Sequence, residues 1–168
     1  LCSQVMGETA ETLADRYRIS REEQDRYSAE SQQRCERARK AGWFADEIVP
    51  VTVPGPKGET LVRDDEHPRD GVTFESLAKL PPVFRKDGTV HAGSSSGLVD
   101  GASAMIVLSA SAARRLGVRP LARIAAWTVA GVPPEIMGIG PVPAVRALLE
   151  KTGLRLEEID LIELNEAF

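Results

Sequence analysis

The amino-acid sequence predicts an α/β fold class, because apolar runs of strand length alternate with helical patterns from residue 102 onward. Residues 102–108 form a compact apolar run. Residues 121–132 form a longer stretch rich in strand-forming residues, and residues 161–164 form a third short apolar run. The resulting order of strand, helix, strand, helix and strand is typical of a sheet covered by helices.

Capping residues mark the two helices between these predicted strands. Ser109 can accept a hydrogen bond from the first turn of a helix that ends at Gly117. Pro141 and Pro143 fit the start of a second helix, which ends near Gly153. Each helix therefore begins with a residue that favours a helix N-terminus and ends at a glycine.

Composition and charge exclude several classes of protein. The 168 residues are 42% hydrophobic and 27% charged, with 21 Lys+Arg and 25 Asp+Glu, so the net charge is −4. This balance argues against nucleic-acid binding, and no apolar run is long enough to cross a membrane. Two cysteines, Cys2 and Cys35, make neither a disulfide scaffold nor a metal cluster. Because the chain starts at Leu1 and stops at Phe168, we expect a piece of a longer protein.

The first 100 residues have a different pattern, with helices and loops. Apolar residues at helical spacing predict a helix over 6–17. Ser20 and Glu23 form a capping box that opens a second helix over 21–40, closed near Gly42. The outer face of this second helix is rich in charged side chains, which we interpret as a solvated face. The charged residues are Arg21, Glu22, Asp25, Arg26, Glu30, Arg34, Arg37, Arg39 and Lys40.

Short elements and loops follow the second helix. Residues 48–53 predict an edge strand, and a turn at 54–58 returns the chain for a partner strand at 60–62. Residues 73–80 predict a short helix that the following prolines end, and residues 87–101 predict a loop.

Two segments carry candidate chemistry, and each also has an ordinary structural interpretation. The Gly93–Gly97 serine cluster is either an anion- or amide-binding loop or a flexible linker. It lacks the Lys of a phosphate-binding loop, and a hydrolase would need a histidine partner where only His67 and His91 are available. Asn165 and Glu166 follow a predicted strand, and they either lie where ligands gather in open α/β sheets or form an ordinary polar loop.

Two further segments leave the same choice open. The glycines of 136–141 precede a helix and either attract the negative end of a ligand or form a plain turn. Arg63 and Arg69 lie in a polar loop, where they either recognise phosphate or are simply solvated. Cys35 is interpreted as an ordinary helix cysteine despite its arginine neighbours.

Taken in order, nine segments of the chain resemble the thiolase family, in particular its acetyl-CoA acetyltransferase and 3-ketoacyl-CoA thiolase branches. The segments are 6–11 (MGETAE), 46–50 (DEIVP), 65–69 (DEHPR), 77–80 (LAKL), 88–90 (GTV), 92–97 (AGSSSG), 100–102 (DGA), 137–144 (MGIGPVPA) and 165–168 (NEAF). The resemblance implies part of a five-layered αβαβα fold. Residues 1–100 would be a loop domain covering the active site, 101–118 the end of the first half, and 119–168 the start of the second.

The resemblance also implies an activity. Thiolases condense two acetyl-CoA molecules to acetoacetyl-CoA, or cleave a 3-ketoacyl-CoA with CoA, through an acyl group carried on a cysteine. Acyl-CoA thioesters would be substrates, with no further cofactor and no metal. We expect a homodimer or homotetramer in the cytoplasm. The alternative is a thiolase-like subunit that binds CoA or supports assembly without catalysis.

The resemblance assigns roles to ten residues of this sequence. Asn165 matches the asparagine that holds a water in the oxyanion hole for the enolate. Ser96 matches a contact with the pantetheine arm of CoA, and Arg69 lies where a cation suits the nucleotide phosphates. The remaining matches line the CoA channel or the acyl pocket: Phe84, Ala92 and Leu98 the channel, and Met6, Met137, Ala167 and Phe168 the pocket.

The resemblance implies that the reactive cysteine and the activating histidine belong to segments before and after these residues. We therefore expect the 168-residue chain by itself to be inactive. Five positions depart from the family pattern, which could retune chain-length preference or mark a weaker paralogue. They are Val5, where His is frequent, Thr12, Ser94 and Val99, where Asn is usual, and His91, where Thr is usual.

Overall fold

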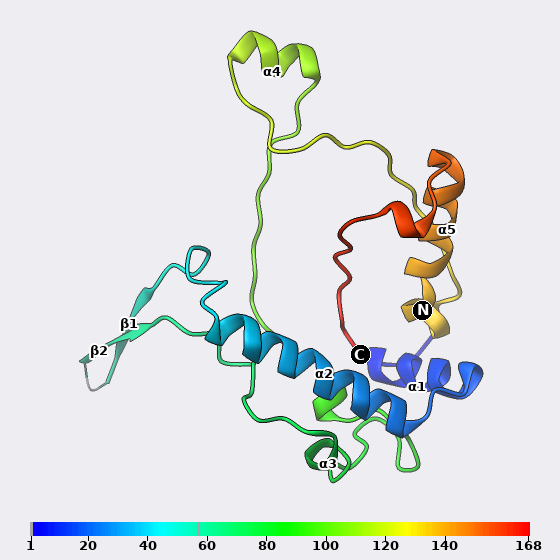
Figure 1. The fold of residues 1–168 in the computed structure, drawn as a ribbon. Helices are drawn as coiled ribbons and strands as arrows, with labels where there is room; N and C mark the ends of the chain where they lie inside the picture. Colours follow the sequence, from blue (N-terminus) through cyan, green and yellow to red (C-terminus); the bar gives the residue numbers. More distant parts are fainter. Residues whose placement is uncertain (1, 57) are drawn as a thin grey trace. The chain divides into compact units, whose positions relative to one another are not determined.

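The computed structural model describes residues 2–56 and 58–168 (Figure 1). The chain divides into two compact units. One comprises Ser3–Gly97 together with Glu166–Phe168, and the other comprises Leu98–Asn165 together with Cys2. The last three residues therefore belong to the same unit as the first helices, although a long intervening segment separates them in sequence.

The two predicted N-terminal helices are confirmed as α1 (Met6–Tyr17) and α2 (Arg21–Lys40). The capping box that opens α2 is present: the Glu23 backbone N–H donates to Ser20 Oγ at 3.2 Å, and the Ser20 N–H donates to the Glu23 carboxylate at 2.7 Å. Arg18 lies in the left-handed region at φ 55°, which ends α1 and lets α2 start in a new direction.

The predicted hairpin is confirmed, with its first strand displaced along the chain. Strands β1 (Val51–Gly55) and β2 (Gly58–Val62) pair antiparallel, with Val51 opposite Val62. The prediction started this strand at Ile48, but the Ile48 N–H donates to Phe44 O in the turns after α2. The predicted turn at 54–58 includes Lys57, which is outside the described residues.

A short helix and a 3₁₀ turn complete this unit. Helix α3 (Phe74–Leu77) is shorter than the predicted 73–80, and the Thr73 hydroxyl caps it by accepting from the Ser76 N–H at 3.2 Å. The predicted loop at 87–101 contains the 3₁₀ turn η1 (Ala92–Ser94). The buried apolar side chains of this unit are few and mostly small: Ala14, Ala29, Ala38, Leu77 and Val90.

The second unit contains both of the helices predicted for it. They are α4 (Ala110–Leu116), capped by Ser109, and α5 (Pro141–Thr152). Gly117 and Gly153 follow them with φ of 65° and 69°, a backbone region that glycine enters without strain. Two 3₁₀ turns, η2 (Pro134–Ile139) and η3 (Leu156–Glu158), flank α5.

The prediction of three strands in the second unit is wrong. Within the described residues, 102–108, 121–132 and 161–164 have no strand hydrogen bonds (Figure 1). A strand exists only when a neighbouring strand accepts and donates along it, and no described segment pairs with these. Their apolar side chains are consequently exposed. Among the described residues, no helix is long and apolar enough to cross a bilayer.

We predict that amide protons in the three unpaired segments exchange rapidly with solvent, whereas those of α2 are protected by helical hydrogen bonds. Hydrogen–deuterium exchange of the 168-residue chain, read by mass spectrometry, measures both in one sample. Protection of 102–108 equal to that of α2 would contradict the prediction and would mean that this segment has found a pairing partner in solution.

Candidate functional site

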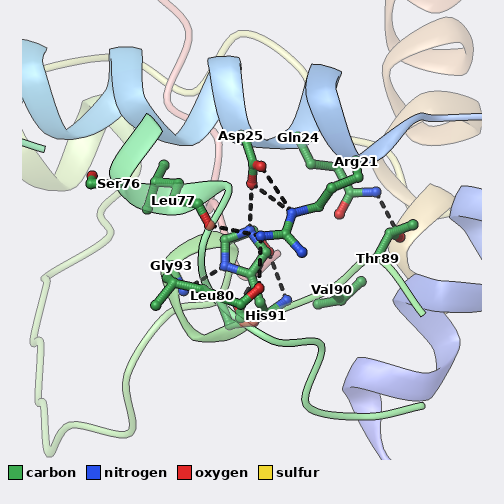
Figure 2. Close-up of polar contacts among 12 residues, drawn as sticks. Arg21, Gln24, Asp25, Ser76, Leu77, Leu80, Thr89, Val90, His91 and Gly93 are labelled. Atoms are coloured by element: carbon green, nitrogen blue, oxygen red, sulfur yellow. Dashed lines mark hydrogen bonds and ion pairs between the residues drawn. The ribbon is translucent and has the colours of Figure 1, made fainter. Parts of the chain in front are cut away.

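A buried polar cluster joins α2 to the loop that precedes η1 (Figure 2). The Arg21 Nε–H group lies 2.9 Å from both carboxylate oxygens of Asp25, one turn along the helix. Asp25 Oδ1 lies 2.6 Å from His91 Nε2. Asp25 and His91 are only 1% and 0% exposed, so the helix and the loop enclose this pair completely.

The hydrogen bonds of His91 define its protonation. The Gly93 backbone N–H donates to His91 Nδ1 at 3.0 Å, so Nδ1 is an acceptor and carries no proton. The single ring proton is therefore on Nε2 and is donated to Asp25. Burial lowers the pKa of His91 below its ordinary value, and the hydrogen bond to Asp25 opposes this shift without cancelling it. His91 is thus a neutral, internal residue.

Arg21 extends the same cluster to α3 (Figure 2). Its Nη2 donates to the backbone oxygens of Leu77 and Leu80 at 2.7 and 2.9 Å. The prediction of a uniformly solvated α2 face is therefore wrong for Arg21 and Asp25, because their side chains satisfy buried backbone and imidazole groups. It holds for the side chain of Arg34, which is 68% exposed. The i,i+4 spacing of Arg21 and Asp25 was the available signal.

The serine cluster is a structured turn as far as Ser95. Ser94 Oγ and Ser95 Oγ both donate to the His91 carbonyl, at 3.2 and 2.9 Å. Further along, Gly97 lies against the ring of His67, where an added Cβ would come within 2.2 Å of the imidazole. The linker interpretation is thus wrong for the first part of this cluster, because local hydrogen bonds fix it.

Four of the residues that the sequence singles out lie together in one unit. The Ser96 N–H donates to the Ala167 carbonyl at 3.0 Å. The rings of Phe84 and Phe168 meet edge to face, with centroids 5.9 Å apart and planes at 80°. Gly7 approaches the Phe84 ring so closely that a Cβ there would lie 2.3 Å from it.

Glu166 connects this group to α2, a role that the sequence did not suggest. One carboxylate oxygen accepts from Tyr27 Oη at 2.6 Å and the other from Ser31 Oγ at 2.7 Å. Hydrogen bonds from Tyr27 and Ser31 hold the pKa of Glu166 below its ordinary value, and the bond to Glu166 raises the pKa of Tyr27. The two partners are 139 and 135 residues away in sequence, so no local pattern reveals them.

The other predicted site residues do not join this group. The Arg69 backbone N–H donates to Gln32 Oε1 at 3.1 Å. Arg69, Met6 and Ala92 are all exposed to solvent. Leu98, Met137 and Asn165 belong to the Leu98–Asn165 unit. Cys2 and Cys35 are free thiols. Within residues 2–56 and 58–168, no group of His, Cys, Asp and Glu could hold a metal ion.

Comparison with known families decides what kind of chain this is. Residues 2–111 match the family described as "Thiolase, N-terminal domain", and residues 118–168 match "Thiolase, C-terminal domain". The chain belongs to the thiolase family. The resemblance read from nine short segments is therefore confirmed at the level of the family.

Individual thiolases are similar over nearly the whole chain. An acetyl-CoA acetyltransferase of Pseudomonas aeruginosa is 57% identical over 164 residues, which is 97% of this chain and 42% of that protein. The crystal structure of the Bacillus anthracis acetyl-CoA acetyltransferase superposes with a TM-score of 0.90 at 49% identity, covering 100% of this chain and 43% of the other.

Human mitochondrial 3-ketoacyl-CoA thiolase, solved in complex with CoA, superposes with a TM-score of 0.85 at 52% identity. That match covers 97% of this chain and 40% of the human one. The chain thus spans about two fifths of the length of these relatives. The thiolase fold is accordingly present in part, as a mixture of helices and short strands.

We predict that acid destabilises the chain through His91. The pKa of His91 in the folded chain lies below its ordinary value. As the pH falls below about 6.5, the unfolded chain therefore binds more protons than the folded chain does. Stability should therefore decrease with pH through this window, before the carboxylates titrate. Urea unfolding at about pH 7.5 and about pH 5.5 measures the change.

The His91→Gln variant is the control for this pH effect, because it removes the titrating ring. We expect it to be less stable at neutral pH but to lose less stability between the two pH values. An equal loss in both proteins would show that another group is responsible.

We predict that Gly7→Ala destabilises the same unit, because the new methyl group would overlap the Phe84 ring at 2.3 Å and push it from Phe168. Overpacking of this kind costs about 1–3 kcal/mol. Chemical denaturation monitors the loss. Gly131→Ala is the matched control, since nothing lies within 4 Å of a Cβ there. An unchanged unfolding midpoint for Gly7→Ala would contradict the close packing.

Proposed function

We propose that this chain forms part of a thiolase-type acyltransferase, which condenses two acetyl-CoA molecules to acetoacetyl-CoA or cleaves a 3-ketoacyl-CoA with CoA. The observation that carries the proposal is the match to both thiolase domains in chain order, over 2–111 and 118–168. High identity to an acetyl-CoA acetyltransferase supports the same reaction class. Because the chain spans about two fifths of that relative, the activity is proposed for an enzyme that includes these residues.

The proposed chemistry has two steps. A cysteine thiolate from the rest of the enzyme attacks the thioester carbonyl, forming a new sulfur–acyl bond while the CoA thiolate leaves and takes up a proton. A base from the rest of the enzyme then takes an α-proton from a second acetyl-CoA, and the resulting carbanion attacks the acyl-cysteine carbonyl, forming a carbon–carbon bond while the cysteine leaves as a thiolate. We assign Asn165 to hold a water that hydrogen-bonds the enolate oxygen as negative charge develops there.

The proposed CoA contacts centre on the Ser96 segment. The Ser96 N–H fixes its backbone against Ala167, and Phe84 and Phe168 supply an adjoining apolar surface suited to the pantetheine arm and acyl group. The exposed Arg69 guanidinium would meet the nucleotide phosphates. Ala92, Leu98, Met6 and Met137 complete the proposed binding residues. CoA in the human relative supports this ligand class.

The assembly and compartment are also part of the proposal. We propose that the full enzyme is a homodimer or homotetramer. Its catalytic thiol must be reduced, which suits the cytoplasm.

A chimera tests the proposed function. The corresponding residues of the 57%-identical Pseudomonas aeruginosa enzyme are replaced by these 168 residues, and cleavage of acetoacetyl-CoA by CoA is followed spectrophotometrically. We expect turnover, and a loss of about 100-fold or more in kcat for Asn165→Ala, in line with removal of one oxyanion-hole donor. A folded chimera that binds CoA without turnover would instead support the non-catalytic subunit.

We also predict that the 168-residue chain alone does not cleave acetoacetyl-CoA. Among the hydrogen bonds of the described residues, neither Cys2 nor Cys35 has a histidine partner to activate its thiol. The same assay with the purified chain at high concentration measures this. Any detectable turnover would overturn the prediction, and turnover that disappears in a Cys35→Ser variant would place the nucleophile on α2.

A further inference from the structure

The segment Glu166–Phe168 is held at each of its three residues by a different part of its unit. The Glu166 carboxylate binds α2 through Tyr27 and Ser31. The Ala167 carbonyl accepts from the Ser96 N–H, and the Phe168 ring packs on Phe84. Asn165, the residue proposed to hold the oxyanion-hole water, precedes this segment by a single peptide bond.

The geometry of α2 explains why two of its side chains bind the Glu166 carboxylate. Tyr27 and Ser31 are four residues apart, so their side chains project from the same face of the helix, one turn from each other. Each hydroxyl donates to a different oxygen of the same carboxylate, at 2.6 and 2.7 Å. Two charge-assisted hydrogen bonds to one planar group restrict both its position and its rotation.

We propose that Glu166 is a positioning residue, which Tyr27 and Ser31 hold in place so that the backbone of the preceding Asn165 is kept in one position. The inference rests on the proposed thiolase function of Asn165. The distance between the α-carbons of Asn165 and Glu166 is about 3.8 Å across the connecting peptide. With Glu166 fixed, the α-carbon of Asn165 is confined to a small region, from which its own torsions direct the amide.

The exposure of the contact argues for positioning rather than stability. Tyr27 is 56% exposed, and hydrogen bonds between solvated groups add little to the free energy of unfolding. The Phe84–Phe168 and Ser96–Ala167 contacts already dock the segment on its unit. What the carboxylate adds is a directional constraint at the residue next to Asn165, and small displacements of a reacting group are costly.

The experiment uses the chimera of the proposed function with three variants: Glu166→Ala, the double variant Tyr27→Phe/Ser31→Ala, and the combination of all three changes. We expect kcat to fall about tenfold in each, with KM for acetoacetyl-CoA within about twofold, since misplacement of a reacting group by 1 Å costs up to about 100-fold. The triple variant should be no worse than Glu166→Ala, because all three changes remove one interaction.

The matched control is Glu22→Gln, which removes an exposed carboxylate of the same helix that pairs with Arg26. It should leave kcat and KM unchanged. An unaltered kcat in Glu166→Ala, a rise in KM alone, or additive losses in the triple variant would each overturn the proposal.

A second measurement decides the inference independently of the reaction. Hydrogen exchange of the 168-residue chain reports the backbone amide of Ser96, which donates to the Ala167 carbonyl and so senses whether the segment stays docked. We expect Glu166→Ala and Tyr27→Phe/Ser31→Ala to speed exchange at Ser96, with α1 unchanged. If the unmodified chimera has no turnover, the proposed function fails, and this measurement alone then decides whether Glu166 fixes the segment. Unchanged exchange at Ser96 would overturn the positioning role.

Discussion

The larger unit, Ser3–Gly97 with Glu166–Phe168, depends on one buried polar cluster. In this cluster Asp25 forms an ion pair with Arg21 and a hydrogen bond with His91. The buried apolar side chains of the unit are few and small, so hydrophobic packing alone specifies little of the arrangement. The polar cluster instead fixes α2 against α3 and the loop before η1 through bonds that work only in one geometry. Removal of Arg21 would leave the buried Asp25 carboxylate without its counter-charge, which is more costly than the intact pair is stabilising.

Helix α2 is therefore a scaffold whose different faces hold different loops. Gln24 donates to Thr89 beside the cluster, and Gln32 and Glu36 accept backbone N–H groups of the 69–71 loop. Tyr27 and Ser31 hold Glu166 on a further face. A helix rich in polar side chains serves this purpose well, because each contact is a hydrogen bond with a defined direction.

Local signals in the sequence predicted the helices and the β1–β2 hairpin well, and the strands of the Leu98–Asn165 unit poorly. Ser20, Ser109, Gly117 and Gly153 determine helix ends through bonds within one turn, so a single stretch of sequence contains the whole interaction. A strand such as 102–108 needs a partner elsewhere, which no local pattern can supply. The candidate site likewise has a part that the sequence predicts and a part that only the folded chain reveals. Motif order predicted Ser96 and Phe168 as site residues, whereas the pairing of Tyr27 with Glu166 depends on the folded arrangement of distant segments.

The return of Glu166–Phe168 to the first unit has a consequence for the order of folding. These contacts close a loop of well over a hundred residues, and the entropy lost on closure must be compensated before the contacts can contribute. Helix α2 and its nearby partners form from shorter loops and therefore assemble sooner. The placement of the segment beside Asn165 would thus be a late event in folding, completed only after the surface that receives it already exists.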